Sequence, residues 1–122
     1  MKNASLIVFV QFYYALDAYY KKSGLPNNAN VNISVIFKQE LLNIGMTSTK
    51  RTEIERFFLK PVGSLNINFS EKESTFITSI QNTYEYLCEE IGPVETDRLF
   101  GLAVDKVSKT KAAQEYSPYQ FL

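Results

Sequence analysis

The segment 39–58, QELLNIGMTSTKRTEIERFF, has the clearest potential for chemistry, which would be contact with nucleic acid. Its apolar spacing and Gly45 predict two helices joined by a tight turn, the arrangement of a DNA-binding helix-turn-helix. The residues expected to meet DNA are Thr49, Lys50, Arg51 and Arg56. Two features weaken this hypothesis. Arg51 falls where the second helix normally buries a side chain, and Glu53 and Glu55 offset the positive charge that phosphate binding needs. An ordinary helical hairpin remains the competing interpretation.

The residues that enzymes use most often are scarce in this chain. It contains no His, so the usual general base, metal ligand and pH switch are missing. The single Cys, Cys88, falls on an apolar helical stripe without a basic neighbour, which indicates a core residue rather than a nucleophile. One Cys permits neither an internal disulfide nor a zinc cluster, which favours a reducing compartment. We therefore expect a cytoplasmic protein that is not an enzyme.

Carboxylates and glycines give no stronger sign of a metal or cofactor. The densest acidic group consists of Glu89, Glu90, Glu95 and Asp97. Its spacing matches no calcium-binding loop, and Glu89 and Glu90 point in different directions on a helix. The five glycines are isolated, so no glycine-rich loop can cradle a phosphate. The prediction is that the protein binds no metal and no cofactor.

Length and charge describe one domain with an uneven charge distribution. At 122 residues the chain can build a single core, and we predict one helical domain over residues 1–122. The net charge is zero, but residues 1–60 have eight Lys and Arg against four Asp and Glu, whereas residues 61–122 have five against nine. Such opposite halves could attract each other between copies, so head-to-tail association is conceivable.

The amino-terminal element is expected to be a helix over residues 3–23 that is apolar on nearly every face. A strand competes over residues 7–12, but the apolar pattern continues to Tyr20, beyond the length of an ordinary strand. The run is shorter than the ~20 residues that a bilayer requires and is interrupted by Gln11 and Asp17, so no membrane contact is expected. A helix of this kind is either central to its domain or buried in a subunit interface. We favour the interface, because one small core can hardly enclose it.

The favoured function follows from this helix. We predict a non-enzymatic protein–protein interaction module, a dimerisation, adaptor or regulatory domain that forms a homodimer or binds another protein. The aromatic segment 115–122, EYSPYQFL, either docks on its own domain or is covered by a partner. The predicted interface residues are Phe9, Phe12, Tyr13, Leu16, Tyr20, Tyr119 and Phe121.

Residues 70–92 are the best-specified helix of the chain. Ser70 and Glu73 have the spacing of a capping box, an apolar stripe follows at steps of three and four, and Gly92 ends it. Pro93 suits the first turn of a further helix. The fold prediction is mainly α, a compact bundle of four to five helices. Alternating residues at 31–35 and 64–69 add the option of a short two-stranded β ribbon.

Overall fold

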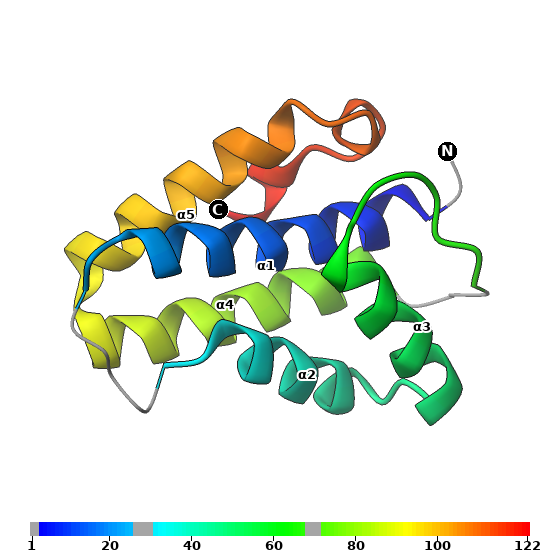
Figure 1. Cartoon of the computed structure of the whole chain (residues 1–122), viewed down its shortest axis with the longest axis horizontal. Helices are drawn as coiled ribbons and strands as arrows, with labels where there is room; N and C mark the ends of the chain where they lie inside the picture. The colour runs from blue at the N-terminus through cyan, green and yellow to red at the C-terminus, as the bar shows by residue number, and fades with distance from the viewer. Residues whose placement is uncertain (1–2, 26–30, 68–71) are drawn as a thin grey trace.

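The computed structural model describes residues 3–25, 31–67 and 72–122, and the regular elements in this part of the chain are all helices (Figure 1). The prediction of a mainly α bundle with four to five helices is thereby confirmed. The elements are α1 (Ala4–Lys22), α2 (Ile33–Ile44), α3 (Ser48–Leu59), α4 (Glu73–Ile91), α5 (Pro93–Ser108) and the short 3-10 helices η1 (Ala112–Gln114) and η2 (Pro118–Phe121).

Helix α1 runs through the middle of the bundle, with α5 on one side and α4 and α2 on the other, and α3 beside its amino-terminal half (Figure 1). It contacts all four other α-helices and both 3-10 helices. Its buried residues are Leu6, Ile7, Val8, Phe9, Val10, Phe12, Tyr13, Ala15 and Leu16. The all-round apolar character of α1 therefore reflects its central position. The expectation that one small chain cannot enclose such a helix is wrong.

Aromatic rings from distant parts of the chain meet around α1. The ring centroid of Phe9 lies 4.5 Å from that of Phe76 in α4 and 6.0 Å from that of Phe37 in α2. Phe12 lies edge-on to Phe100 of α5 at 5.1 Å. Such pairs contribute about 0.5–1.5 kcal/mol beyond the burial of their area. The same side chains that drive burial thus also fix how the helices are oriented around α1.

The carboxyl-terminal segment docks on its own domain, which decides between the two alternatives for it. Tyr116, Pro118 and Phe121 are buried, and η2 packs against α4 and α5 as well as α1. The Phe121 ring lies 5.7 Å from that of Phe12. Tyr119 and Leu122 remain accessible, at 55% and 68% exposed.

The two-stranded ribbon is not found among the described residues. Ile33 to Val35 belong to α2, because the Asn32 side chain caps this helix and accepts a hydrogen bond from the Val35 N–H at 3.2 Å. Residues 64–67 contain no strand, and residues 68 and 69 lie outside the described part. The Asn3 side-chain amide donates to the carbonyls of Leu65 (3.0 Å) and Ile67 (2.9 Å). One side chain thus takes the place of a partner strand.

The first residue of α5 is the one predicted from the sequence, whereas α4 begins later than predicted. Pro93 is the first residue of α5, as predicted, and Gly92 ends α4 with a φ of 86° that favours glycine. Helix α4 begins at Glu73 with Lys72 as its N-cap, later than the predicted capping box requires. Ser70, the proposed cap, lies outside the described residues.

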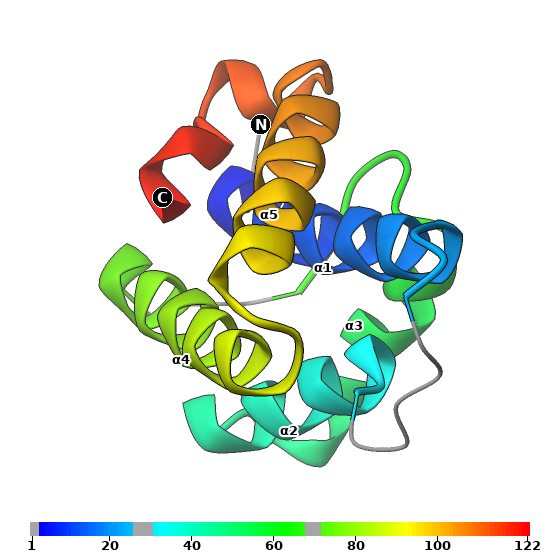
Figure 2. The same cartoon turned by 90° about the vertical axis from the view of Figure 1, so that its left-hand side faces the viewer.

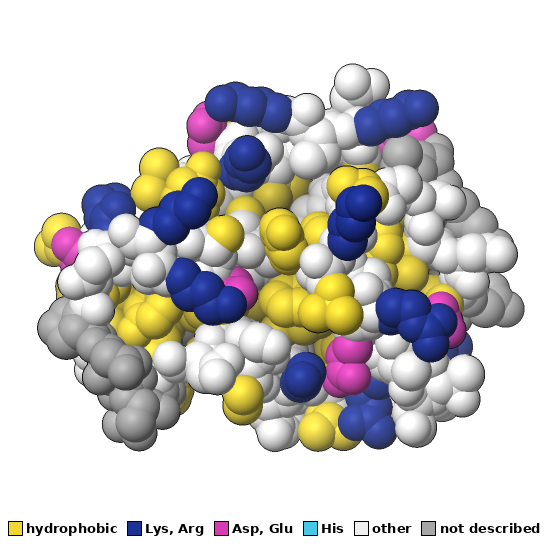
Figure 3. All heavy atoms as spheres, in the orientation of Figure 1, with side chains coloured by type: hydrophobic (Ala, Val, Ile, Leu, Met, Phe, Trp, Pro, Cys, Tyr) yellow, Lys and Arg dark blue, Asp and Glu magenta, His cyan; other side chains and the backbone are white. Residues whose placement is uncertain are grey.

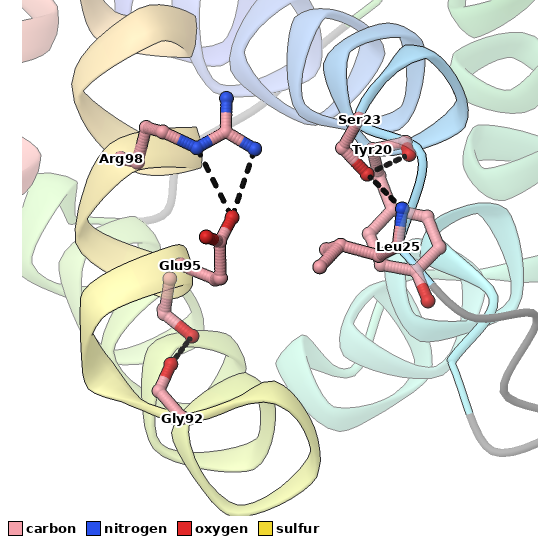
Figure 4. Close-up of polar contacts among 7 residues, drawn as sticks. Tyr20, Ser23, Leu25, Gly92, Glu95 and Arg98 are labelled. Atoms are coloured by element: carbon pink, nitrogen blue, oxygen red, sulfur yellow. Dashed lines mark hydrogen bonds and ion pairs between the residues drawn. The ribbon is translucent and has the colours of Figure 1, made fainter.

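At one end of the bundle, local hydrogen bonds hold the residues that follow α1 and the first turns of α5 in place (Figure 4). After α1, the Ser23 hydroxyl donates to the Tyr20 carbonyl at 2.7 Å and accepts from the Leu25 N–H at 3.2 Å. In the first turns of α5, Arg98 donates through Nε and Nη2 to one oxygen of Glu95, at 3.0 and 2.9 Å. These bonds satisfy backbone and charged groups without any contribution from a partner.

Because Phe12 is internal, replacing it should unfold the protein rather than release subunits. We expect Phe12→Ala to lower the free energy of unfolding by about 3–5 kcal/mol, since it leaves a cavity between α1, α5 and η2. Denaturant unfolding combined with sedimentation measures both quantities. The control Val94→Ala, at a position 77% exposed on α5, should change stability by no more than about 0.5 kcal/mol. A stable Phe12→Ala variant of reduced mass would contradict the core assignment.

Candidate functional site

Most of the predicted interface residues lie inside the chain. Phe9, Phe12, Tyr13 and Leu16 have no exposed surface, and Phe121 is only 4% exposed. Their burial comes from α2, α4, α5 and η2 of the same chain, so a partner that docks on the folded domain does not reach them.

The other two predicted interface residues are partly or largely accessible. Tyr119 is 55% exposed in η2. Tyr20 is half-buried near the end of α1, beside Leu25 (Figure 4). The Tyr20 hydroxyl is buried and has no hydrogen-bond partner among the described residues. The structure does not bring Tyr20 and Tyr119 together into one surface with the five buried residues.

Residues 33–59 form two helices, α2 and α3, joined by a short turn. Gly45, with a φ of 85°, ends α2, and the Thr47 hydroxyl accepts from the Lys50 N–H at 3.4 Å to start α3. Thr49 and Arg56 are exposed on α3, but Arg56 is paired with Glu53 at 3.2 Å.

Arg51 and Lys50 are less accessible than a DNA-reading helix would require. Both are half-buried, and the Arg51 Nε is buried without a hydrogen-bond partner among the described residues. The motif is a helical hairpin whose outer face carries little net positive charge. DNA contact through these residues stays an untested prediction.

A groove with basic rims lies between α1, α5 and the segment 60–62. Its volume is about 450 Å³, and its apolar floor includes Tyr14, Ala15 and Val62. Figure 3 shows hydrophobic side chains in the middle of this face, with Lys and Arg side chains around them. We call it the basic groove, and its rims carry Lys22, Lys60 and Lys106.

Gln11 holds both walls of the basic groove in place. Its side-chain N–H donates to the Pro61 carbonyl at 3.1 Å, and its side-chain oxygen accepts from the Thr110 hydroxyl at 3.1 Å. One polar side chain on α1 therefore ties the 60–62 segment and the end of α5 to the central helix. In the sequence, Gln11 is visible only as an interruption of an apolar run.

The rim lysines of the basic groove are free of internal ion pairs with described residues. The nearby carboxylates are already engaged, Asp17 with Lys21 at 3.0 Å and Asp105 with Lys109 at 3.4 Å. Lys22, Lys60 and Lys106 come from three separate segments, so no run of charge in the sequence predicts that they meet. Together with the apolar floor, they favour an occupant that is both anionic and apolar.

A second groove, which we call the acidic groove, lies between α4, α5 and η2. Its volume is about 700 Å³, and its apolar surface is formed by Ile80, Phe100, Phe121 and Leu122. Glu85 and Asp97 supply its carboxylates.

Tyr84 lies across the acidic groove and joins its two helices. Its hydroxyl donates to Asp97 Oδ1 at 2.5 Å, and its ring packs edge-on to Phe100 at 5.3 Å. The hydrogen bond to the Asp97 carboxylate, followed by the neighbouring Cys88, raises the pKa of Tyr84 above its ordinary value. Tyr84 therefore keeps its proton to higher pH than an ordinary tyrosine.

The two grooves lie on opposite sides of α5. Figure 2 shows α4 and η2 on one side of this helix, and α1 with the green segment that includes residues 60–62 on the other. A single helix thus separates a surface with unpaired lysines from a surface with carboxylates.

No cluster of metal-ligating side chains is found in the part of the chain that the structure describes. Three or more Cys, Asp or Glu side chains nowhere converge there in a way that could hold a metal ion. Cys88 is half-buried on α4 and is not part of the buried core, which differs from the core position predicted from the sequence. Among the described helices, none is long and apolar enough to cross a membrane.

Comparison with protein-family models, curated proteins and solved structures finds no match to this chain.

Buried Tyr13 makes stability depend on pH in the alkaline range. Its hydroxyl is 2.7 Å from the Thr83 hydroxyl, and burial raises the pKa of Tyr13 well above the ordinary 10.0. Below pH 10.0 both states keep the proton. Above it the unfolded chain releases a proton that the folded chain retains, so stability falls as pH rises.

We expect this tyrosine to contribute a decline of about 1.4 kcal/mol per pH unit above its unfolded pKa. The free energy of unfolding of the Tyr13→Phe variant should lack this part of the decline with pH. At lower pH it should differ from that of the parent by a constant amount. Denaturant unfolding at a series of pH values measures it. Parallel curves for parent and variant throughout the alkaline range would contradict the burial effect.

Proposed function

We propose that this protein is a non-enzymatic interaction module that self-associates head to tail, with the basic groove of one copy against the acidic groove of the next. The observation that carries this proposal is the pair of oppositely charged grooves, each with an apolar floor, on the two sides of α5. It retains the prediction of a protein–protein interaction domain but moves the contact from α1 to these grooves.

Each groove offers what the other lacks. Lys22, Lys60 and Lys106 have no ion-pair partner among the described residues, and the acidic groove presents Glu85 and Asp97. Opposite charges steer the encounter and fix the register, whereas burial of apolar surface supplies most of the affinity. Each groove also has an exposed apolar side chain. Val62 in the basic groove is 65% exposed, and Leu122 in the acidic groove is 68% exposed.

A second copy is favoured over an unrelated acidic partner because the complementary surface is on the same chain. The net charge of zero removes overall repulsion between copies. Since the two contact surfaces differ, the contact is heterologous, and it leads to a closed ring or an open chain rather than a two-fold dimer. This differs from the homodimer expected from the sequence.

Charge reversal in each groove tests the proposal. We expect Lys60→Glu with Lys106→Glu to weaken self-association at least about tenfold, equivalent to 1.4 kcal/mol, and Glu85→Lys with Asp97→Lys to do the same. When the two variants are mixed, the intact grooves can pair with each other, and the two altered grooves are again opposite in charge. The mixture should therefore regain association that neither variant shows alone, measured by sedimentation velocity at low salt.

The matched control for the lysine variant is Lys38→Glu with Lys72→Glu, which changes the net charge equally at exposed positions outside both grooves. It should associate like the parent. The proposal fails if the parent is monomeric at high concentration, if the control dissociates equally, or if the groove variants do not complement each other.

Binding of duplex DNA through α3 is the second candidate function. The favourable observation is the position of α3 at the edge of the bundle, where it follows a tight turn and leaves Thr49 and Arg56 exposed. The pairing of Arg56 with Glu53 and the partial burial of Arg51 speak against strong phosphate contact.

If α3 does bind DNA, the affinity should fall with salt, and Arg51→Glu with Arg56→Glu should abolish it. Removing each phosphate contact reduces the slope of log affinity against log salt by about 0.9. Fluorescence anisotropy with a labelled duplex measures this, with Lys72→Glu, at the exposed N-cap of α4, as a control away from α3. Absence of binding by the parent at low salt removes this candidate.

A further inference from the structure

A carboxylate lies buried in the floor of a third hollow, between α2 and α4. Glu40 is only 6% exposed, yet it borders a cleft of about 560 Å³. The cleft is lined by the apolar side chains of Val35 and Ile36 and by the amides of Asn32, Gln39 and Asn82, with Thr83 and Tyr86 completing it. Glu40 follows Phe37 and Ile36 by three and four residues, which places a charge on the inward face of α2.

The two oxygens of Glu40 are not equally satisfied. Oε2 accepts from the Asn43 side-chain amide at 2.9 Å, and Asn43 is itself fixed by Gln39 at 3.1 Å. Oε1 has only a long contact of 3.5 Å with the Asn82 amide. A carboxylate can accept about four hydrogen bonds, so Oε1 retains most of its capacity.

No Lys or Arg among the described residues forms an ion pair with Glu40. A buried carboxylate is costly unless a cation or strong hydrogen bonds compensate for its lost hydration. Here the compensation comes from neutral amides alone, and one of the two contacts is long. A cation that enters the cleft would complete the coordination of Oε1 at little cost, since the carboxylate is already desolvated and held by Asn43.

We propose that this cleft binds a primary ammonium or guanidinium group carried on a short apolar stem, with Glu40 as the anionic partner. Val35 and Ile36 supply apolar contact for the stem, and the side-chain oxygen of Asn82 supplies an acceptor for a remaining N–H group. The same chemistry is offered by a free alkylamine and by a Lys or Arg side chain of another protein. The cleft involves neither α5 nor η2, so this proposal is independent of the head-to-tail contact.

Titration with n-butylammonium and n-butylguanidinium, followed by NMR of the side-chain amides, tests the proposal on the full chain. We expect saturable shifts for Asn43 and Asn82, and no such shifts with n-butanol, which has the same stem without the charge. Glu40→Gln should weaken binding at least about tenfold because it removes the charge but keeps the shape. The control Glu89→Gln removes an exposed charge from α4 and should bind like the parent.

A second variant does not depend on removing Glu40. Ile36→Lys places an ammonium group one helical turn before Glu40, where it should occupy the cleft and abolish binding of the added cations while the helical signal is preserved. Nα-acetyl-lysine methylamide distinguishes the sources. Binding of this compound supports a protein side chain as the natural ligand, whereas binding of the small cations alone supports a free amine. The proposal is overturned if neither cation gives saturable shifts, if butanol shifts the same amides, or if Glu40→Gln binds like the parent.

Discussion

Burial of α1 on all sides is the constraint on which the rest of this structure depends. Its apolar residues from Leu6 to Leu16 are covered by four α-helices and by η2, all from one chain. Each covering helix presents only one apolar stripe, so its orientation is set by the need to place that stripe on α1. The basic and acidic grooves lie at the surface of the bundle, where neighbouring elements of this arrangement meet. The position of every candidate site is thus a consequence of how α1 is wrapped.

Polar side chains within this apolar frame decide details that hydrophobic packing leaves open. Gln11 on α1 joins Pro61 and Thr110, which fixes the width of the basic groove. Asn3 donates to the carbonyls of Leu65 and Ile67, which have no partner strand among the described residues. Each bond adds only about 1 kcal/mol net, but a buried group left without it would cost more. Their contribution is mainly to specify one arrangement among several of similar hydrophobic burial.

The helices could be predicted from the sequence because their signals are local. Apolar spacing, Gly45, Gly92 and Pro93 define their extent, whereas the ribbon prediction failed because the cap at Asn32 outweighed a short alternation. Whether an apolar face lies in the core or at an interface could not be predicted in the same way. An all-round apolar helix gives the same pattern in a core and in an interface, and only the tertiary structure distinguishes them. The basic groove combines side chains from three distant segments of the chain. Likewise, Glu40 lies in a cleft only because α4 residues such as Asn82 pack opposite it.

The docking of η2 has a consequence for biosynthesis. Phe121 completes the ring cluster around Phe9 and Phe12, although it is translated more than a hundred residues after Phe9. Until the segment that contains Phe121 has left the ribosome, the aromatic face of α1 lacks part of its cover. Long-range contacts of this kind slow folding and leave apolar surface exposed to aggregation. The nascent chain therefore exposes aromatic side chains of α1 for most of the time in which residues 9–121 are synthesised.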